Sequence, residues 1–338
     1  MRTITNNSGI ALPLAVWLLH DTYDYINEPN YISATALMKP IRQIIIPPRI
    51  PAGTVTEDVE DYIARALGHS LHDSIERAWE NGHKKSLALL GYPNKLIEKI
   101  LVNPTDEERN AVVGCIPVYL EQRAYRKITV RGVTYTLGGK FDMAADGIIQ
   151  DNKSTSVNTW IYGGRDSEHQ LQMSLYRWLD LGRVAEGNLP RITEDFGRIN
   201  YIFTDFSKNM AKTNPKYPSK RVEEKELWLL SPEETQAWVE NKLNQLEQYK
   251  NTPEHLLPEC TDEELWRSAP RYKYFSDPAK ANDPSARSTK NFDDAGEAHM
   301  FMAEKGKGVV KTIPGEVKRC SYCAAFDGCT QKDRYIQP

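Results

Sequence analysis

The stretch Gly139–Thr155, GKFDMAADGIIQDNKST, predicts two short β-strands that bring acidic side chains close to a lysine. Residues 144–147, AADG, have the small and turn-forming character that joins antiparallel strands. Successive side chains of a strand point to opposite faces, so we expect Asp151 and Lys153 to share a face while the asparagine between them points away. If the turn pairs the two strands, Asp142 joins that face.

Two carboxylates and one ammonium group at a single point suit the metal-dependent hydrolysis of a phosphodiester. Mg²⁺ and Mn²⁺ prefer hard oxygen ligands, and Mg²⁺ usually takes one or two carboxylates and keeps several waters. The cation activates water and neutralises charge on the phosphate, while a neighbouring lysine orients the water or stabilises the transition state. The alternative is a solvated hairpin, because D-x-K is a common tripeptide.

An upstream segment, 64–82, has the periodicity of a helix. Its apolar positions, with the residue before it, predict a buried stripe of Ile63, Leu67, Leu71, Ile75 and Trp79. His72 lies off this stripe, four residues after Gly68 and so on the same flank. His69 is a rival candidate ligand, and the spacing alone does not choose between the two histidines.

A downstream segment, 167–182, predicts a second amphipathic helix whose apolar stripe is Leu171, Leu175, Trp178 and Leu179. Gln172 and Tyr176 are four residues apart and therefore neighbours on one side of this helix. An amide and a phenol at that spacing could contact a phosphate or a base beside the metal. The Q-x3-Y pattern alone is weak, because it occurs often by chance.

The order of these motifs resembles the RecB-like branch of the PD-(D/E)XK nuclease superfamily. The order is G-x3-H on a helix, G-x2-D on a strand, D-x-K on the next strand and Q-x3-Y on a helix, over roughly Gly68 to Tyr176. The resemblance implies an α/β fold of restriction-endonuclease type, with a central mixed sheet flanked by helices. It implies that His72, Asp142 and Asp151 bind the metal, that Lys153 is catalytic, and that Gln172 and Tyr176 form the accessory motif.

The resemblance also favours His72 over His69 and draws attention to Glu121, because relatives often have a glutamate just before the Asp142 strand. We treat Glu121 only as a candidate to support the metal ligands, and the alternative is an exposed strand glutamate.

The five cysteines suggest a second metal centre. Cys320-x2-Cys323-x5-Cys329 has metal-ligand spacing, because a tight turn can direct several thiolates at one ion. Cys260 is the best candidate for a fourth ligand, whereas Cys115 lies in an apolar run and is expected to be an ordinary buried thiol. Disulfides are the competing account, but no secretory segment supports them.

Zinc and an iron–sulfur cluster both accept four thiolates, and the spacing does not separate them. The resemblance favours [4Fe–4S], since many RecB-like nucleases hold such a cluster with three cysteines after the core. In those relatives the first cysteine usually precedes the core. Here residues 31–35 contain no cysteine, and Cys260 follows the core. Zn²⁺ therefore remains the alternative to a [4Fe–4S] cluster at this site.

The bulk composition gives no overall nucleic-acid signature. With 43 basic and 46 acidic residues among 338, the net charge is −3, so DNA binding would need a localised basic groove. The apolar run 10–19 is too short to span a membrane and contains Pro13. It also lacks the basic flank and cleavage site of a signal peptide, so we expect a cytoplasmic protein without membrane contact.

The chain divides, by its sequence, into three parts. We expect an N-terminal arm over 1–55, a nuclease core over 56–252, and a C-terminal extension over 253–338 that contains a small α/β insert and the four-cysteine site. Expected elements are a helix near 33–45, mainly helices over 57–125, strands near 121–131, 133–143, 146–153 and 198–206, and a helix over 231–250. The basic segment 207–221 is either a solvated loop or a contact with the DNA backbone.

The most specific expectation is a Mg²⁺- or Mn²⁺-dependent DNA nuclease, an exonuclease acting at DNA ends in recombination, repair or phage DNA metabolism. One alternative is a noncatalytic DNA-binding or assembly module that retains the nuclease fold, and another is an endonuclease. The sequence contains neither a P-loop nor a helicase motif, so any recombination or helicase partner would be a separate protein.

Overall fold

The computed structural model describes residues 3–21, 25–163 and 165–336, which form two compact units. Unit 1 comprises Met1–Lys39 and Ala52–Glu247, and unit 2 comprises Pro40–Pro51 and Gln248–Pro338. The first 55 residues, which the sequence suggests are a single arm, are therefore shared between the two units. None of the described helices combines the length and apolar character that a membrane crossing needs.

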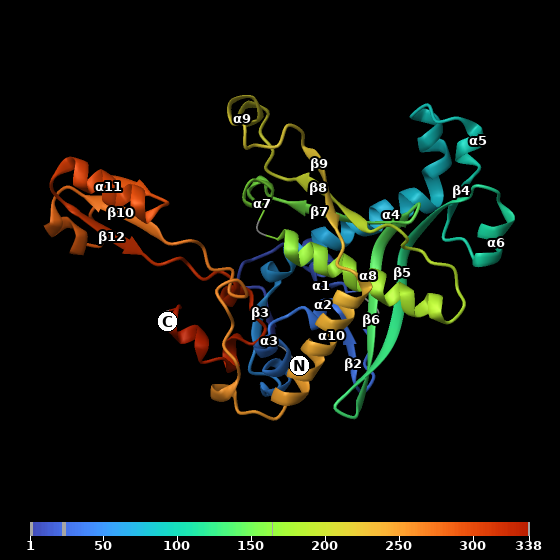
Figure 1. Cartoon of the computed structure of the whole chain (residues 1–338), viewed down its shortest axis with the longest axis horizontal. Helices are drawn as coiled ribbons and strands as arrows, with labels where there is room; N and C mark the ends of the chain where they lie inside the picture. Colours follow the sequence, from blue (N-terminus) through green and yellow to red (C-terminus); the bar gives the residue numbers. More distant parts are fainter. Residues whose placement is uncertain (1–2, 22–24, 164, 337–338) are drawn as a thin grey trace. The chain divides into compact units, whose positions relative to one another are not determined.

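Unit 1 is built on a seven-stranded mixed β-sheet with the order β4-β5-β6-β7-β8-β9, to which β2 is added by pairing with β6 (Figure 1). The strands are β2 (Tyr31–Ser33), β4 (Ile100–Val102), β5 (Ile116–Val130), β6 (Val133–Ala145), β7 (Ile148–Thr155), β8 (Phe196–Phe203) and β9 (Val222–Trp228). Strands β5, β6 and β7 form an antiparallel meander, whereas β8 runs parallel to β7.

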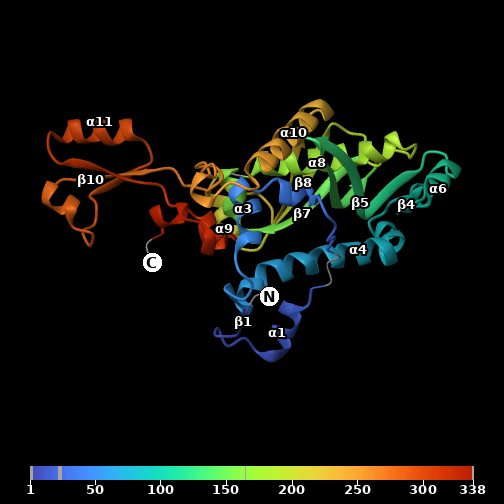
Figure 2. The same ribbon diagram turned by 90° about the horizontal axis from the view of Figure 1, so that it is seen from below.

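Helices cover both faces of this sheet, so unit 1 has an α/β fold (Figure 2). Helix α4 (Ile63–Leu89) lies on one face, where Trp79 and Leu87 pack against a buried cluster of Ile100, Val118, Leu120 and Met143. Helix α8 (Asp166–Ala185) lies on the other face, and α10 (Pro232–Tyr249) packs beside it through a hydrogen bond from Trp178 Nε1 to Gln236 Oε1 of 2.8 Å.

Two glycines allow α8 to lie directly on the sheet. A Cβ atom at Gly139 of β6 would come within 2.8 Å of both Tyr176 and Leu179. A Cβ atom at Gly197 of β8 would come within 2.6 Å of the Met173 sulfur. Only glycine therefore permits this close approach, which fixes α8 relative to the strands that bear Asp142 and Asp151.

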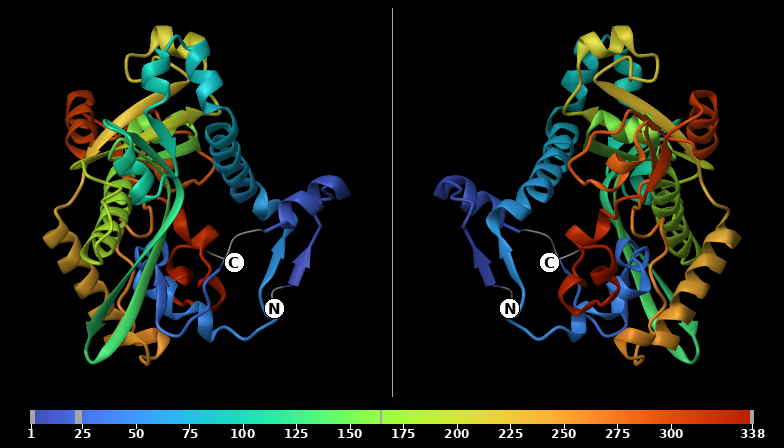
Figure 3. Two further views of the ribbon diagram at one scale, coloured as in Figure 1. Left: turned by 90° about the vertical axis from the view of Figure 1, so that its right-hand side faces the viewer. Right: turned by 90° about the vertical axis from the view of Figure 1, so that its left-hand side faces the viewer.

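The N-terminal part of unit 1 packs on the first turns of α4 (Figure 3). It comprises β1 (Thr3–Thr5), β3 (Thr56–Asp58), which pairs in parallel with β1, and α1 (Leu12–Leu19). The predicted buried stripe on α4 was wrong at Ile63 and Leu67, which are 37% and 55% exposed. These early turns precede the part of α4 that packs on the sheet, so their apolar side chains are left partly in solvent.

Two other expectations from the sequence were wrong in detail. The helix predicted near 33–45 is broken into β2, α2 (Ala34–Leu37) and α3 (Ile41–Ile45), because Pro40 disfavours helical backbone at the residue before it. The mainly helical region predicted over 57–125 is interrupted by β4 and by the first residues of β5.

Unit 2 combines α3 and the 3₁₀ turn η1 (Pro47–Arg49) with the C-terminal part of the chain. It contains a small insert in which α11 (Ala295–Lys305) packs on an antiparallel sheet of order β11-β10-β12 (Figure 1). The strands of the insert are β10 (Arg271–Phe275), β11 (Lys290–Phe292) and β12 (Val309–Ile313). Most of the rest is short 3₁₀ turns: η3 (Glu254–Leu256), η5 (Arg319–Tyr322), η6 (Phe326–Gly328) and η7 (Gln331–Arg334).

Candidate active site

The site forms where β6 and β7 separate. The two strands pair from Met143–Ala145 to Ile148–Gln150, and the next position in that register would place Asp142 opposite Asp151. The pairing stops there, because β7 continues beside β8 while the rest of β6 lies between β5 and β2. The two carboxylates therefore lie across the opening between the strands.

Helix α4 adds a histidine to this pair of carboxylates. His72 Nδ1 lies 3.0 Å from Asp142 Oδ2, and the ligand atoms of His72, Asp142 and Asp151 all lie within 4.8 Å of one another. Lys153 Nζ lies 2.8 Å from Asp151 Oδ2. The other oxygen, Asp151 Oδ1, is buried and has no hydrogen-bond partner among the described residues. An unpartnered buried carboxylate oxygen is a suitable ligand for a cation.

The pKa values of the two carboxylates are shifted in opposite directions. Burial, opposed by Lys153 and assisted by the charge of Asp142, raises the pKa of Asp151 to about 6. Burial also acts to raise the pKa of Asp142, but the hydrogen bond from His72 together with the charges of His72 and Lys153 lowers the pKa of Asp142 overall. The same hydrogen bond raises the pKa of His72. Two close carboxylates resist joint ionisation unless a cation compensates them.

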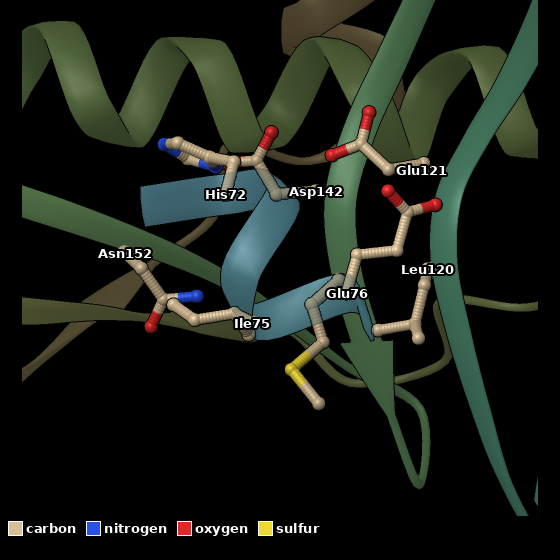
Figure 4. A pocket seen from close by; sticks show the side chains of 8 residues that line it. His72, Ile75, Glu76, Leu120, Glu121, Asp142 and Asn152 are labelled. Carbon is tan, nitrogen blue, oxygen red and sulfur yellow. The ribbon is translucent and has the colours of Figure 1, made fainter. Parts of the chain in front are cut away.

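A pocket adjoins His72 and Asp142 on the α4 side of the sheet (Figure 4). It is lined by His72, Ile75, Glu76, Leu120, Glu121, Asp142, Met143 and Asn152. Glu121 has a left-handed φ of 50° and interrupts the β5–β6 pairing opposite Asp142, between the pairs that Leu120 and Gln122 make. Its carboxylate forms an ion pair of 2.5 Å with Lys140. Backbone strain of this kind is often found at functional sites.

Glu76 is a pocket residue that the sequence did not single out. It lies one helical turn after His72, and burial, followed by the charge of Glu121, raises its pKa. Its carboxylate faces that of Glu121 in the pocket (Figure 4). The four-residue spacing from His72 was the available signal, because residues i and i+4 share a helical face.

Gln172 and Tyr176 lie on α8, as expected, and interact with each other. Gln172 Nε2 donates a hydrogen bond of 3.2 Å to the Tyr176 hydroxyl. The Tyr176 ring is 9% exposed and packs against Gly139 and Phe141, on the strand that bears Asp142.

A buried histidine and tyrosine adjoin Lys153. Tyr201 of β8 is the register partner of Lys153, and its hydroxyl lies 3.2 Å from His169 Nδ1 on α8. Burial, followed by the charge of Lys153, lowers the pKa of His169 to about 4. His169 is therefore neutral near pH 7. Sequence reasoning assigned neither residue to the site and predicted 198–206 only as a strand.

Four cysteines lie in unit 2, close enough for their charges to affect one another. Cys260 follows η3, Cys320 lies in η5, and Cys323 and Cys329 follow η5 and η6. Burial, followed by Glu264 and Cys329, raises the pKa of Cys260 to about 12. Burial also raises the pKa of Cys320, with further contributions from its two neighbouring cysteines.

The spacing of these sulfurs differs from that of a zinc site. No three of them lie within 4.8 Å of one another in the described part of the chain. A tetrahedral zinc at about 2.3 Å from each sulfur would separate the sulfurs by about 3.8 Å. The remaining cysteine, Cys115, belongs to unit 1, apart from the other four, and is less buried than the ordinary buried thiol that was predicted.

Comparisons with known proteins give little further information. No protein-family model matches the chain, and no curated protein sequence matches it. A solved structure described as "Crystal structure of SSO0001" is 16% identical and has a TM-score of 0.43, over 73% of this chain and 90% of that chain. A likeness at that level carries no argument about fold or function.

Proposed function

We propose that this protein is a Mg²⁺- or Mn²⁺-dependent deoxyribonuclease with a RecB-like PD-(D/E)XK core. The observation that carries the proposal is the convergence of His72, Asp142 and Asp151 ligand atoms within 4.8 Å, with Lys153 Nζ 2.8 Å from Asp151. Three hard or borderline ligands beside a lysine form a site that is open to water and phosphate, as divalent-metal hydrolysis requires.

The position of each motif on the fold supports the RecB-like core. His72 lies on α4, Asp142 on β6, Asp151 and Lys153 on β7, and the Q-x3-Y pair on α8. The elements occur in the order that the resemblance requires, within one mixed sheet covered by helices on both faces. The motifs are weak singly, but the fold brings the first three to one point.

Each residue has a distinct role in the proposed reaction. A bound divalent cation supplies Lewis-acid activation of water and neutralises charge on the phosphate. His72, Asp142 and Asp151 hold that cation, and the unpartnered Asp151 Oδ1 is free to face it. Lys153 orients the attacking water and stabilises the charge that develops on the phosphate. Gln172 and Tyr176 contact the substrate.

A polyanionic substrate is supported by the basic segment after β8. Between Asp205 and Glu223 the chain contains no acidic residue, and it has exposed cations at Lys208, Lys212, Lys216, Lys220 and Arg221. The segment is hydrogen-bonded to the ends of two strands: Thr204 N donates to Thr155 O at 2.9 Å, and Phe203 N donates to Arg221 O at 2.9 Å. Thr155 follows the catalytic lysine by two residues. Because the first of these bonds reaches the strand two residues after Lys153, we propose that the segment binds the DNA backbone beside the site.

For the second centre we propose that Cys260, Cys320, Cys323 and Cys329 hold a [4Fe–4S] cluster, with zinc as the alternative. The preference for the cluster rests on the resemblance to RecB-like nucleases, because four thiolates accept either metal. Its role is structural: four thiolates saturate either metal and leave no open position for hydrolysis.

The test is cleavage of end-labelled DNA by the full-length protein with Mg²⁺, Mn²⁺ or EDTA. We expect cation-dependent cleavage that Lys153→Ala reduces about a thousandfold and the exposed-lysine control Lys127→Ala leaves intact. No cleavage by the folded, metal-supplemented protein would contradict the proposal and favour a noncatalytic module.

The same assay separates an exonuclease from an endonuclease. Linear and covalently closed circular DNA, each single- and double-stranded, are compared at one protein concentration. We expect linear DNA to be degraded from its ends while closed circles survive. Degradation of circles would keep the nuclease but assign it as an endonuclease.

A further inference from the structure

Helix α3 belongs to unit 2, although it precedes the rest of that unit by about two hundred residues of chain. The close packing is seen at Gly328, which lies between Cys323 and Cys329. A Cβ atom at Gly328 would come within 2.7 Å of the side chain of Ile46, the residue that ends α3. The cysteine loop and α3 are therefore in direct contact.

Two consecutive residues of α3 direct hydrogen-bond donors at two of the cysteine sulfurs. Arg42 Nη1 lies 3.4 Å from Cys329 Sγ, and Gln43 Nε2 lies 3.1 Å from Cys323 Sγ. Both sulfurs accept these bonds from side chains that carry donors and, in the case of Arg42, a permanent positive charge.

Every N–H group of the Arg42 guanidinium donates a hydrogen bond within unit 2. Arg42 is 4% exposed, and its five N–H groups each have an acceptor. Nε donates to Pro258 O, Nη2 donates to Glu254 O and Leu257 O, and Nη1 donates to the Glu254 carboxylate and to Cys329 Sγ. The sulfur is thus one of five acceptors around a buried cation, and its loss would leave an N–H unpaired.

A neutral thiol is only a weak acceptor, whereas a thiolate accepts a charge-assisted hydrogen bond. The two donors are therefore placed to bond to these sulfurs when the sulfurs bind a metal, because a metal ligand must be a thiolate. Glu254 holds Arg42 in place from the other side, because its carboxylate also accepts a hydrogen bond of 3.0 Å from Thr330 N, next to Cys329.

We infer that Arg42 and Gln43 are positioning residues of the cysteine centre, which orient the Cys329 and Cys323 sulfurs as metal ligands by N–H···S hydrogen bonds. They slow the loss of metal and, with iron, raise the reduction potential, because hydrogen bonds and positive charge at the sulfurs stabilise the more negative reduced state. The inference rests on the cysteine centre proposed above and is independent of the nuclease reaction.

The variants are chosen to separate this role from folding. Gln43→Met removes the donor but keeps the length of a half-buried side chain, and Arg42→Lys keeps the charge but loses the planar fork. Arg49→Gln is the matched control, because Arg49 lies on the same segment. Its guanidinium bonds the Thr252 and Lys250 carbonyls and contacts no cysteine.

The experiment uses full-length protein purified without oxygen. Iron and zinc per chain, absorbance near 400 nm, the rate of metal loss to a chelator and, with iron, the midpoint potential are measured beside far-UV circular dichroism. We expect Gln43→Met and Arg42→Lys to lose metal about tenfold faster than the wild type, with a more negative potential, and Arg49→Gln to match the wild type.

Two outcomes overturn the inference. Gln43→Met that folds and retains metal and potential like the wild type overturns it while leaving the cysteine centre in place. If Arg42→Lys does not fold, Gln43→Met alone decides. Wild-type protein that binds neither iron nor zinc overturns the centre and the inference together, whereas cleavage of DNA would still be open to its own test.

Discussion

The carboxylate site of unit 1 and the cysteine cluster of unit 2 are built in opposite ways. In unit 1, His72, Asp142 and Asp151 come from a helix and two diverging strands, and a buried oxygen of Asp151 is left without a partner. In unit 2, short 3₁₀ turns carry the cysteines, and two of the sulfurs already accept hydrogen bonds from Arg42 and Gln43.

Under the proposed function, this difference distinguishes a hydrolytic site in unit 1 from a structural metal centre in unit 2. Hard ligands with unsatisfied oxygens leave room for water and phosphate around a cation. Four thiolates, two of which already accept hydrogen bonds, would saturate a metal and tie irregular backbone together. Changes in the first set should therefore affect cleavage, and changes in the second should affect folding and metal content.

The largest expected effect is on cleavage, in the unit 1 site. Asp142→Asn and Asp151→Asn each remove a charged ligand, so we expect Mn²⁺ binding to weaken and cleavage to fall by at least a hundredfold while the fold is retained. Calorimetric titration with Mn²⁺ and the end-labelled DNA assay measure the two effects. Asp146→Asn, in the exposed turn between the same strands, is the control. Full activity in Asp151→Asn would contradict the site.

The next effect should appear in unit 2 as a loss of stability. Metal binding by a thiolate site is part of the folding free energy and is on the order of 10 kcal/mol. Cys323→Ser should therefore lower soluble yield, metal content and thermal stability before it changes the cleavage rate per folded molecule. Cys115→Ser, in unit 1, should leave all of these unchanged. A Cys323→Ser protein with full metal content and normal stability would contradict the structural role of the cysteine centre.

The pH dependence of stability tests the electrostatics of the unit 1 site separately from cleavage. The folded pKa of Asp151, about 6, exceeds its usual 3.8, so its protonated form contributes stability that is complete below pH 4 and lost as pH rises through 6. The raised pKa of His72 has the same sign. In EDTA, Asp151→Asn should therefore gain stability relative to the wild type between pH 5 and 8, by at most about 3 kcal/mol. Urea titrations measure it, and a constant difference across this range would contradict the assignment.

Addition of Mn²⁺ should reverse that trend in the wild type, because the ligands must lose their protons to bind the cation. The thermal shift caused by Mn²⁺ should grow from pH 5 to pH 8, and it should be absent from Asp151→Asn.

A moderate effect is expected from the basic segment. The double variant Lys208→Glu, Lys212→Glu should raise KM for DNA more than it lowers kcat, because these exposed cations bind phosphate without contacting the reacting atoms. The slope of log affinity against log salt should decrease by about two. The control is the double variant Lys95→Glu, Lys127→Glu, which reverses the charge of two exposed lysines outside the segment. Equal salt slopes for the two double variants would leave 207–221 a solvated loop.

The smallest effect is expected at Tyr176. Tyr176→Phe removes the hydroxyl that accepts the Gln172 hydrogen bond but keeps the ring against Gly139. We expect a severalfold loss of kcat/KM, far smaller than at Asp142. Tyr162→Phe, at a ring that is 79% exposed, is the control. A loss as large as that of Lys153→Ala would show that Tyr176 acts in the chemistry itself.

Local sequence patterns predicted the parts of this protein that depend on local geometry. Strand alternation is enough to place Lys153 beside Asp151, and the four-residue spacing is enough to place Gln172 beside Tyr176. The short strands β2, β4 and β9 were not predicted, because strands of three to seven residues have weak patterns and depend on their partners in the sheet.

The sequence could not predict features that depend on distant contacts. The exposure of Leu67 follows from where α4 meets the sheet, and the kink at Glu121 follows from the way β5 and β6 pair. The role inferred for Arg42 depends on Glu254 and Cys329, which are 212 and 287 residues away. No local pattern around Arg42 contains that information.

The most direct test of two metal centres with different ligands is anomalous X-ray scattering from crystals of protein purified without oxygen and soaked in Mn²⁺. Data are collected at the manganese, iron and zinc absorption edges. We predict a manganese peak among His72, Asp142 and Asp151, and a separate peak among the four cysteines at the iron edge, or at the zinc edge if zinc is the metal. Manganese absent from the carboxylates, or bound only at the cysteines, would contradict the account.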